Sequence, residues 1–107
     1  MKGWVNAVTL KDQFSPLHFA SYKGQLDAIN TLLRFGADKD ALTATGLNML
    51  HVAAQGDAAS SLFIFKELGL DINSADKRGS TPLHWACFRQ SEIALGYLLA
   101  WGPQLDS

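Results

Sequence analysis

A period of 33 residues runs through this chain of 107 residues and constrains its fold more than any other feature. The segments 15–20, 48–53 and 81–86 read Ser-Pro-Leu-His-Phe-Ala, Asn-Met-Leu-His-Val-Ala and Thr-Pro-Leu-His-Trp-Ala. Glycine keeps the same spacing at Gly3, Gly36, Gly69 and Gly102. Such a period is typical of solenoids, in which a unit cannot bury its own apolar face and stacks on its neighbours.

Each period predicts a pair of helices followed by an extended loop. In the third unit, Thr81 can cap a helix through its hydroxyl, and Pro82 suits the first helical position. We expect helices over about 82–89 and 91–100, with Gly102 as a left-handed C-cap. The apolar stripe of the second helix is formed by Ala94, Leu95, Leu98 and Leu99.

The second unit departs from the other two in the turn between its helices. Ser15 and Asn48 stand at the capping positions of the first and second units. However, Gly56 comes one residue before the position that Gly24 marks in the first unit. We therefore expect a looser or shifted turn in the second unit.

These units resemble ankyrin repeats, whose hallmark is this period with Thr-Pro-Leu-His-x-Ala at the start of the first helix. Segment 81–86 matches that motif outright, and the resemblance covers about residues 9–107. It implies an all-α solenoid of stacked antiparallel helix pairs joined by β-turn loops. We expect one continuous domain, divided into 1–8 (the tail of a preceding repeat), 9–41, 42–74 and 75–107.

The repeated histidines do not indicate a metal site. They are His18, His51 and His84. Zinc ligands must converge on one atom, whereas equivalent residues of stacked units form a ladder. The resemblance implies instead that each histidine forms hydrogen bonds near the start of its own helix.

No catalytic constellation is visible, and we predict that the chain is not an enzyme and holds no cofactor or metal. It lacks a nucleophile elbow, a Walker loop and a dinucleotide-binding fingerprint. Cys87 corresponds to the small residues Ser21 and Ala54, so we expect a buried, unreactive thiol. The acidic residues Asp38 and Asp40 are attributed to a solvated loop.

Composition indicates a cytoplasmic protein without a nucleic-acid partner. The net charge of −1 provides no bulk attraction to nucleic acid or to a membrane. The longest apolar run, 62–65, is too short to insert into a bilayer, and the first residues do not form a signal peptide. A single cysteine fits a reducing compartment.

The resemblance implies that a partner protein or peptide binds a concave groove formed by the first helices and the loop tips. The candidate binding residues are Phe19, Tyr22, Lys23, Val52, Gln55, Lys77, Arg78, Trp85, Phe88 and Arg89. Aromatic residues and arginine dominate interface energies, so this groove suits an extended segment with apolar anchors. The alternative is that Phe19 and Trp85 only seal the helix packing. A further hypothesis is that the repeats self-associate end to end.

A second resemblance is to the N-terminal ankyrin region of DHHC-type protein S-acyltransferases, or palmitoyltransferases. It is carried by segments 51–57, 76–87 and 91–101. This resemblance implies a substrate-recruiting array in a larger membrane-bound protein, at the cytosolic face of the membrane. The chain itself contains no Asp-His-His-Cys motif. The sequence thus supports two hypotheses: an interaction module, or a fragment of an S-acyltransferase whose catalytic part lies outside this chain.

Overall fold

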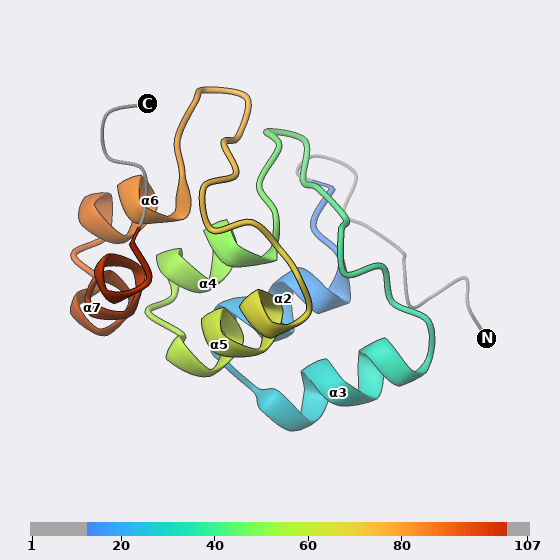
Figure 1. The fold of residues 1–107 in the computed structure, drawn as a ribbon. Coiled ribbons are helices and arrows are strands. Elements are labelled where there is room, and N and C mark those ends of the chain that lie inside the picture. The colour runs from blue at the N-terminus through green and yellow to red at the C-terminus, as the bar shows by residue number, and fades with distance from the viewer. Residues whose placement is uncertain (1–12, 103–107) are drawn as a thin grey trace.

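A computed structural model describes residues 13–102, which form three helix pairs connected by extended loops (Figure 1). The first helices of the pairs are α2 (Pro16–Lys23), α4 (Met49–Gln55) and α6 (Pro82–Phe88). The second helices are α3 (Leu26–Arg34), α5 (Ala59–Glu67) and α7 (Glu92–Ala100). The all-α fold expected from the period is thus confirmed, whereas the expected tail over residues 1–8 lies outside the described residues.

The helices form two layers. Helix α4 packs between α2 and α6, α5 contacts both α3 and α7, and each first helix packs on the second helix of its own pair. The loops 38–47 and 71–80 rise on one side of these layers (Figure 1). There the N–H of Lys77 donates to the carbonyl of Thr45 at 3.0 Å. The middle helix pair therefore has a neighbouring pair on each side, and the two loops bond to each other.

Each first helix begins with a capping box that contains the repeated histidine. The side chains of Ser15, Asn48 and Thr81 accept from the backbone N–H three residues later. In return, the Nδ1 atoms of His18, His51 and His84 accept the capping residues' own N–H groups at 3.0, 3.0 and 2.9 Å. An imidazole thus takes the place of the glutamate or glutamine that usually closes this box. The expected local role of the histidines is confirmed.

His51 also connects the second helix pair to the third. Because its Nδ1 is an acceptor, the neutral ring carries its proton on Nε2. That Nε2 lies 2.9 Å from the carbonyl oxygen of Ser80, in the loop that leads to α6. Burial lowers the pKa of His51, although the Ser80 carbonyl and the Asp76 charge act in the opposite direction. Burial also lowers the pKa of His18.

The turn of the second unit keeps the register of the others, so the expected shift is wrong. Gly24, Asp57 and Gln90 occupy equivalent positions and all have left-handed backbones, with φ of 69°, 52° and 55°. Their N–H groups bond to the equivalent carbonyls of Ser21, Ala54 and Cys87. Aspartate tolerates this conformation better than most residues, so the turn does not need a glycine.

Gly56 instead allows the first two helix pairs to approach closely. Its φ is −89°, which any residue can adopt. A Cβ atom at this position would overlap the backbone carbonyl of Tyr22, in the last turn of α2. The glycine is therefore required by packing between units rather than by the turn.

Cys87 is exposed, so the prediction of a buried thiol is wrong. Its equivalents Ser21 and Ala54 are completely buried. Ser21 is covered by the second helix pair, since Ser61 donates to its carbonyl at 2.7 Å. No residue within 13–102 covers Cys87 in this way, because α6 and α7 form the last described pair. Burial at this position comes from the next unit and not from the local sequence.

The apolar stripe expected on α7 is buried only in part. Ala94 and Leu98 are completely buried, whereas Leu95 is half-buried and Leu99 remains exposed. The inner half of the stripe packs against the core, which also contains Leu62 of α5. The outer half lies at the edge of the described stack.

We expect the free energy of unfolding to fall as the pH drops below about 6.5. In the unfolded chain His18 and His51 protonate near their ordinary pKa of 6.5, whereas burial lowers both pKa values in the folded chain. The unfolded state then binds more protons, so acid shifts the equilibrium toward it. The slope is at most about 1.4 kcal/mol per pH unit for each histidine. Urea unfolding at about pH 7.5, 6.5 and 5.5 measures it.

His51→Gln is the control for this pH dependence. Glutamine preserves an acceptor for the N–H of Asn48 but does not titrate. The slope should fall by up to about half, whatever the absolute stability of the variant. A slope identical to that of the wild type would show that His51 does not carry the effect.

Two glycine-to-alanine substitutions should have opposite effects on stability. Gly56→Ala forces a methyl group against the carbonyl of Tyr22 and should destabilise the fold by about 1–3 kcal/mol. Gly96→Ala adds a methyl group that meets nothing within 4 Å, on a helix, and should stabilise by about 0.5–1 kcal/mol. Urea midpoints compare the two variants. Equal destabilisation would refute the packing role of Gly56.

Candidate functional site

Three of the four aromatic candidates lie in two separate ring pairs: Phe19 in one, and Trp85 with Phe88 in the other. Phe19 on α2 and Phe88 on α6 are 56% and 68% exposed. The ring of Phe19 meets Phe14 edge-on, with 5.3 Å between centroids, and that of Phe88 meets Trp85 in the same way at 5.9 Å. Edge-to-face contacts of this kind hold aromatic rings in defined orientations. Each end of the row of first helices therefore presents one exposed, supported phenyl ring.

Val52 does not face a partner, which corrects the sequence-based prediction. Its side chain is completely buried. It is the smallest of three equivalent residues, between Phe19 and Trp85, and α4 is flanked by both other first helices. The middle position is thus closed over, and the expected aromatic ladder is interrupted there.

Four of the other candidates meet at the ends of the first helices. These four candidates are Tyr22, Lys23, Gln55 and Arg89. They line a hollow of about 470 Å³, which we call the polar hollow. Its other lining residues are Gly56, Asp57, Gln90 and Ser91. Nη2 of Arg89 donates to the hydroxyl of Tyr22 at 3.3 Å, although the two residues are 67 positions apart. Residues of all three units therefore converge on this hollow.

The loop-tip candidates Lys77 and Arg78 are exposed and do not line the polar hollow. Their position depends on Asp76, a residue that the sequence prediction omitted. Oδ1 of Asp76 accepts from the N–H groups of Arg78 and Ser80, both at 2.9 Å. This is the aspartate turn that the loop sequence favours, so the aspartate-to-glycine spacing was the signal available.

Asp76 also fixes the indole of Trp85. Nε1 of Trp85 donates to Oδ2 of Asp76 at 3.0 Å, and this aspartate is only 8% exposed. Burial would raise the pKa of the Asp76 carboxyl, but the hydrogen bonds from Ser80, Trp85 and Arg78 outweigh it and hold the pKa below its usual value. The carboxylate thus ties the basic loop tip to the half-buried Trp85.

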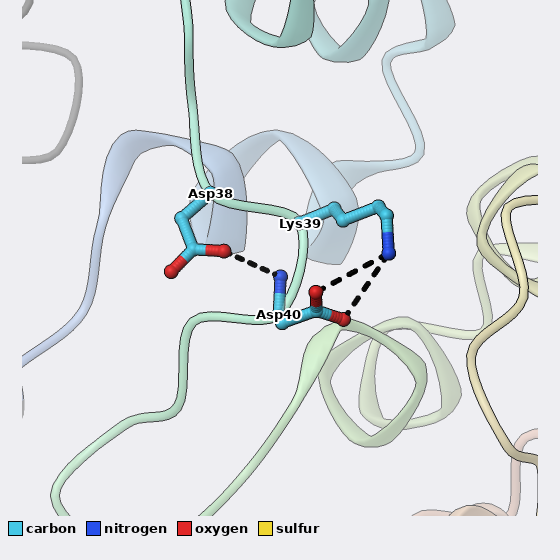
Figure 2. A network of polar contacts seen from close by, with 3 residues as sticks. All are labelled: Asp38, Lys39 and Asp40. Atoms are coloured by element: carbon cyan, nitrogen blue, oxygen red, sulfur yellow. Dashed lines mark hydrogen bonds and ion pairs between the residues drawn. The ribbon is translucent and has the colours of Figure 1, made fainter.

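The acidic residues after α3 serve the loop itself. Figure 2 shows Oδ1 of Asp38 accepting from the N–H of Asp40 at 3.0 Å, while Lys39 forms an ion pair with the Asp40 carboxylate at 3.2 Å. The equivalent residues one period later repeat the backbone contact, since Asp71 accepts from the N–H of Asn73 at 2.9 Å. These carboxylates stabilise turns. Within residues 13–102, His, Cys, Asp and Glu form no group of three that could hold a metal ion.

A second hollow, which the sequence prediction missed, lies on the second helices. It encloses about 450 Å³ and is lined by Leu26, Ala59, Ser60, Phe63, Ile64, Glu67 and Tyr97. We call it the apolar hollow. Phe63, one of the residues that line it, is 55% exposed. The apolar run 62–65 was the available signal. None of the helices between residues 13 and 102 has the length and apolar character needed to cross a membrane.

Comparison with known proteins identifies the repeat and several relatives. The family model described as ankyrin repeats (3 copies) matches residues 17–107. Palmitoyltransferase AKR1 of Lachancea kluyveri is 32% identical over 79% of this chain, and that of Kluyveromyces lactis is 28% identical over 87%. The nuclear factor NF-kappa-B p105 subunit of Rattus norvegicus is 31% identical over 87%.

The chain spans only a small part of each relative: 12% and 13% of the two palmitoyltransferases and 10% of the p105 subunit. The similarity therefore concerns the repeats that these different proteins share. The family match covers most of the chain, including all three helix pairs from Leu17 onward. The period, the capped helix pairs and this match together show that the chain belongs to the ankyrin repeat family.

Proposed function

We propose that this chain is a protein-interaction module that binds an extended segment of a partner protein along the first-helix face. This face comprises the exposed residues of α2 and α6, the partly exposed Gln55 of α4, and the loop tip at Lys77 and Arg78. Ankyrin repeats are in general protein-interaction modules. The observation that carries the proposal is the supported aromatic pair Trp85 and Phe88 on α6, the helix whose C-cap residue Arg89 lines the polar hollow.

The geometry of Trp85 suits an anchor for binding. Its indole is held by Asp76 and its ring by Phe88, so little side-chain freedom remains to be lost when a partner binds. A group ordered in advance contributes more of its contact energy to affinity. Trp85 also packs against the core, so its role in stability coexists with its role on the surface.

On this proposal, the chain recruits protein substrates for a larger, membrane-bound palmitoyltransferase at the cytosolic face of the membrane. The two palmitoyltransferase relatives support this assignment. Because the chain spans 12% and 13% of their lengths, any acyl transfer belongs to parts outside residues 1–107. Sequencing the transcript on both sides tests the assignment. Transmembrane segments and an Asp-His-His-Cys motif are expected, and a complete reading frame without them would refute it.

Trp85→Ala should weaken binding to a peptide ligand about 30-fold or more, since truncating an aromatic anchor costs about 2–4 kcal/mol. An array of synthetic peptides with leucine or phenylalanine anchors supplies the probe, and fluorescence anisotropy of the best binder gives the Kd. Circular dichroism establishes the temperature range in which the variant is folded.

Two control variants show which layer of helices holds the peptide. Trp85→Phe keeps an aromatic ring but loses the bond to Asp76, so we expect a loss below about tenfold. Phe63→Ala removes an aromatic ring that is more exposed than Trp85, from the apolar hollow, and should leave the Kd unchanged. If Phe63→Ala abolished binding and Trp85→Ala did not, the ligand would occupy the second helices and the proposal would be wrong.

A further inference from the structure

The polar hollow contains two cations without an anionic partner among residues 13–102. Lys23 and Arg89 both line it and both are exposed. The ion pair found in the described part of the chain joins Lys39 and Asp40, in a loop that does not line the hollow. Lys23 and Arg89 are equivalent residues of the first and third units, 66 positions apart, with Gly56 at the position between them.

The one carboxylate that lines the hollow is committed to a helix. Oδ1 of Asp57 accepts from the N–H of Ala94 at 2.8 Å. Ala94 is the third residue of α7, and the N-cap residue Ser91 makes no side-chain capping bond of its own. Asp57 therefore caps α7 from the neighbouring unit, a role that anchors its charge to the helix end. Lys23, Arg89 and Asp57 together leave the hollow with a formal charge of +1.

The guanidinium of Arg89 is partly oriented before any ligand arrives. Nη2 of Arg89 donates to the Tyr22 hydroxyl. This bond uses one of the five N–H groups of the guanidinium. The remaining donors can form charge-assisted hydrogen bonds, which are shorter and stronger than neutral ones. Gln55 and Gln90 add amide donors to the same lining.

The geometry points to a carboxylate as the ligand of the polar hollow: an aspartate or glutamate of the bound segment, placed beside an apolar residue that contacts Trp85 and Phe88. This inference rests on the proposed function, because the same extended segment supplies both groups. A carboxylate carries one negative charge and balances the +1 of the hollow. A phosphate dianion would exceed that charge and repel Asp57.

An array of synthetic peptides of about twelve residues tests the inference. Each peptide carries a leucine anchor, followed one to four positions later by Asp, Glu, Asn, Gln, Lys or phosphoserine. We expect acidic peptides to bind about tenfold more tightly than their Asn or Gln counterparts, as a charge-assisted bond predicts. The advantage should shrink as salt rises from about 0.05 to 0.5 M, because exposed charges are screened.

Charge reversal identifies the residues responsible. The double variant Lys23→Glu and Arg89→Glu should prefer Lys peptides over Asp peptides. Arg34→Glu, an equal change at an exposed position on α3, should keep the acidic preference. If the double reversal does not fold, Lys23→Gln with Arg89→Gln should abolish the preference without reversing it.

The outcomes distinguish this inference from the proposed function. Equal binding of acidic and amide peptides, with a loss of binding in Trp85→Ala, would overturn the carboxylate site and leave the first-helix face intact. Tightest binding of the phosphoserine peptides would show that the hollow takes phosphate. Binding that responds to neither Trp85→Ala nor charge would contradict both proposals.

Discussion

The imidazole of His51 makes a bond on which the stacking of the second unit against the third depends. Nδ1 closes the cap of α4 and Nε2 reaches the carbonyl of Ser80 in the following loop. One buried side chain thus satisfies a helix end and joins two units. A glutamine could close the cap, but a planar ring with nitrogens on opposite edges bonds in both directions at once. Because Nδ1 accepts a hydrogen bond only while the ring is neutral, protonation ends this double role.

Burial in this chain is a property of position in the stack. His18 and His51 are completely buried, whereas His84 is exposed, although all three form the same capping box. Ser21 and Cys87 differ in the same way. In a solenoid each unit covers its neighbour, so equivalent residues acquire different environments according to the unit that packs beside them. The exposure of a residue at a repeated position therefore cannot be transferred from one unit to the next.

The sequence predicted what local chemistry determines. The period, the caps at Ser15, Asn48 and Thr81, and the three helix pairs follow from interactions within a unit. The prediction failed at Val52, Gly56 and Cys87, where the outcome depends on a neighbouring unit. Of the candidate site, the cluster at Tyr22, Lys23, Gln55 and Arg89 was anticipated by equivalence of position. The hydrogen bonds of Asp57 and Asp76 were not predicted, because each depends on one particular donor elsewhere in the fold. Asp57 accepts from the N–H of Ala94, and Asp76 accepts from the indole of Trp85.

Packing and recognition meet at a single position in the period. Lys23, Gly56 and Arg89 are equivalent, and the middle one has no side chain because the Tyr22 carbonyl leaves no room for one. That absence draws the first two units together and leaves open space between two cations. A side chain at position 56 would affect both consequences at once, since its Cβ would overlap the Tyr22 carbonyl at a position that also lines the hollow. The repeated capping residues thus determine how each first helix begins, whereas a position that varies between units determines both how two units approach and what the stacked surface can bind.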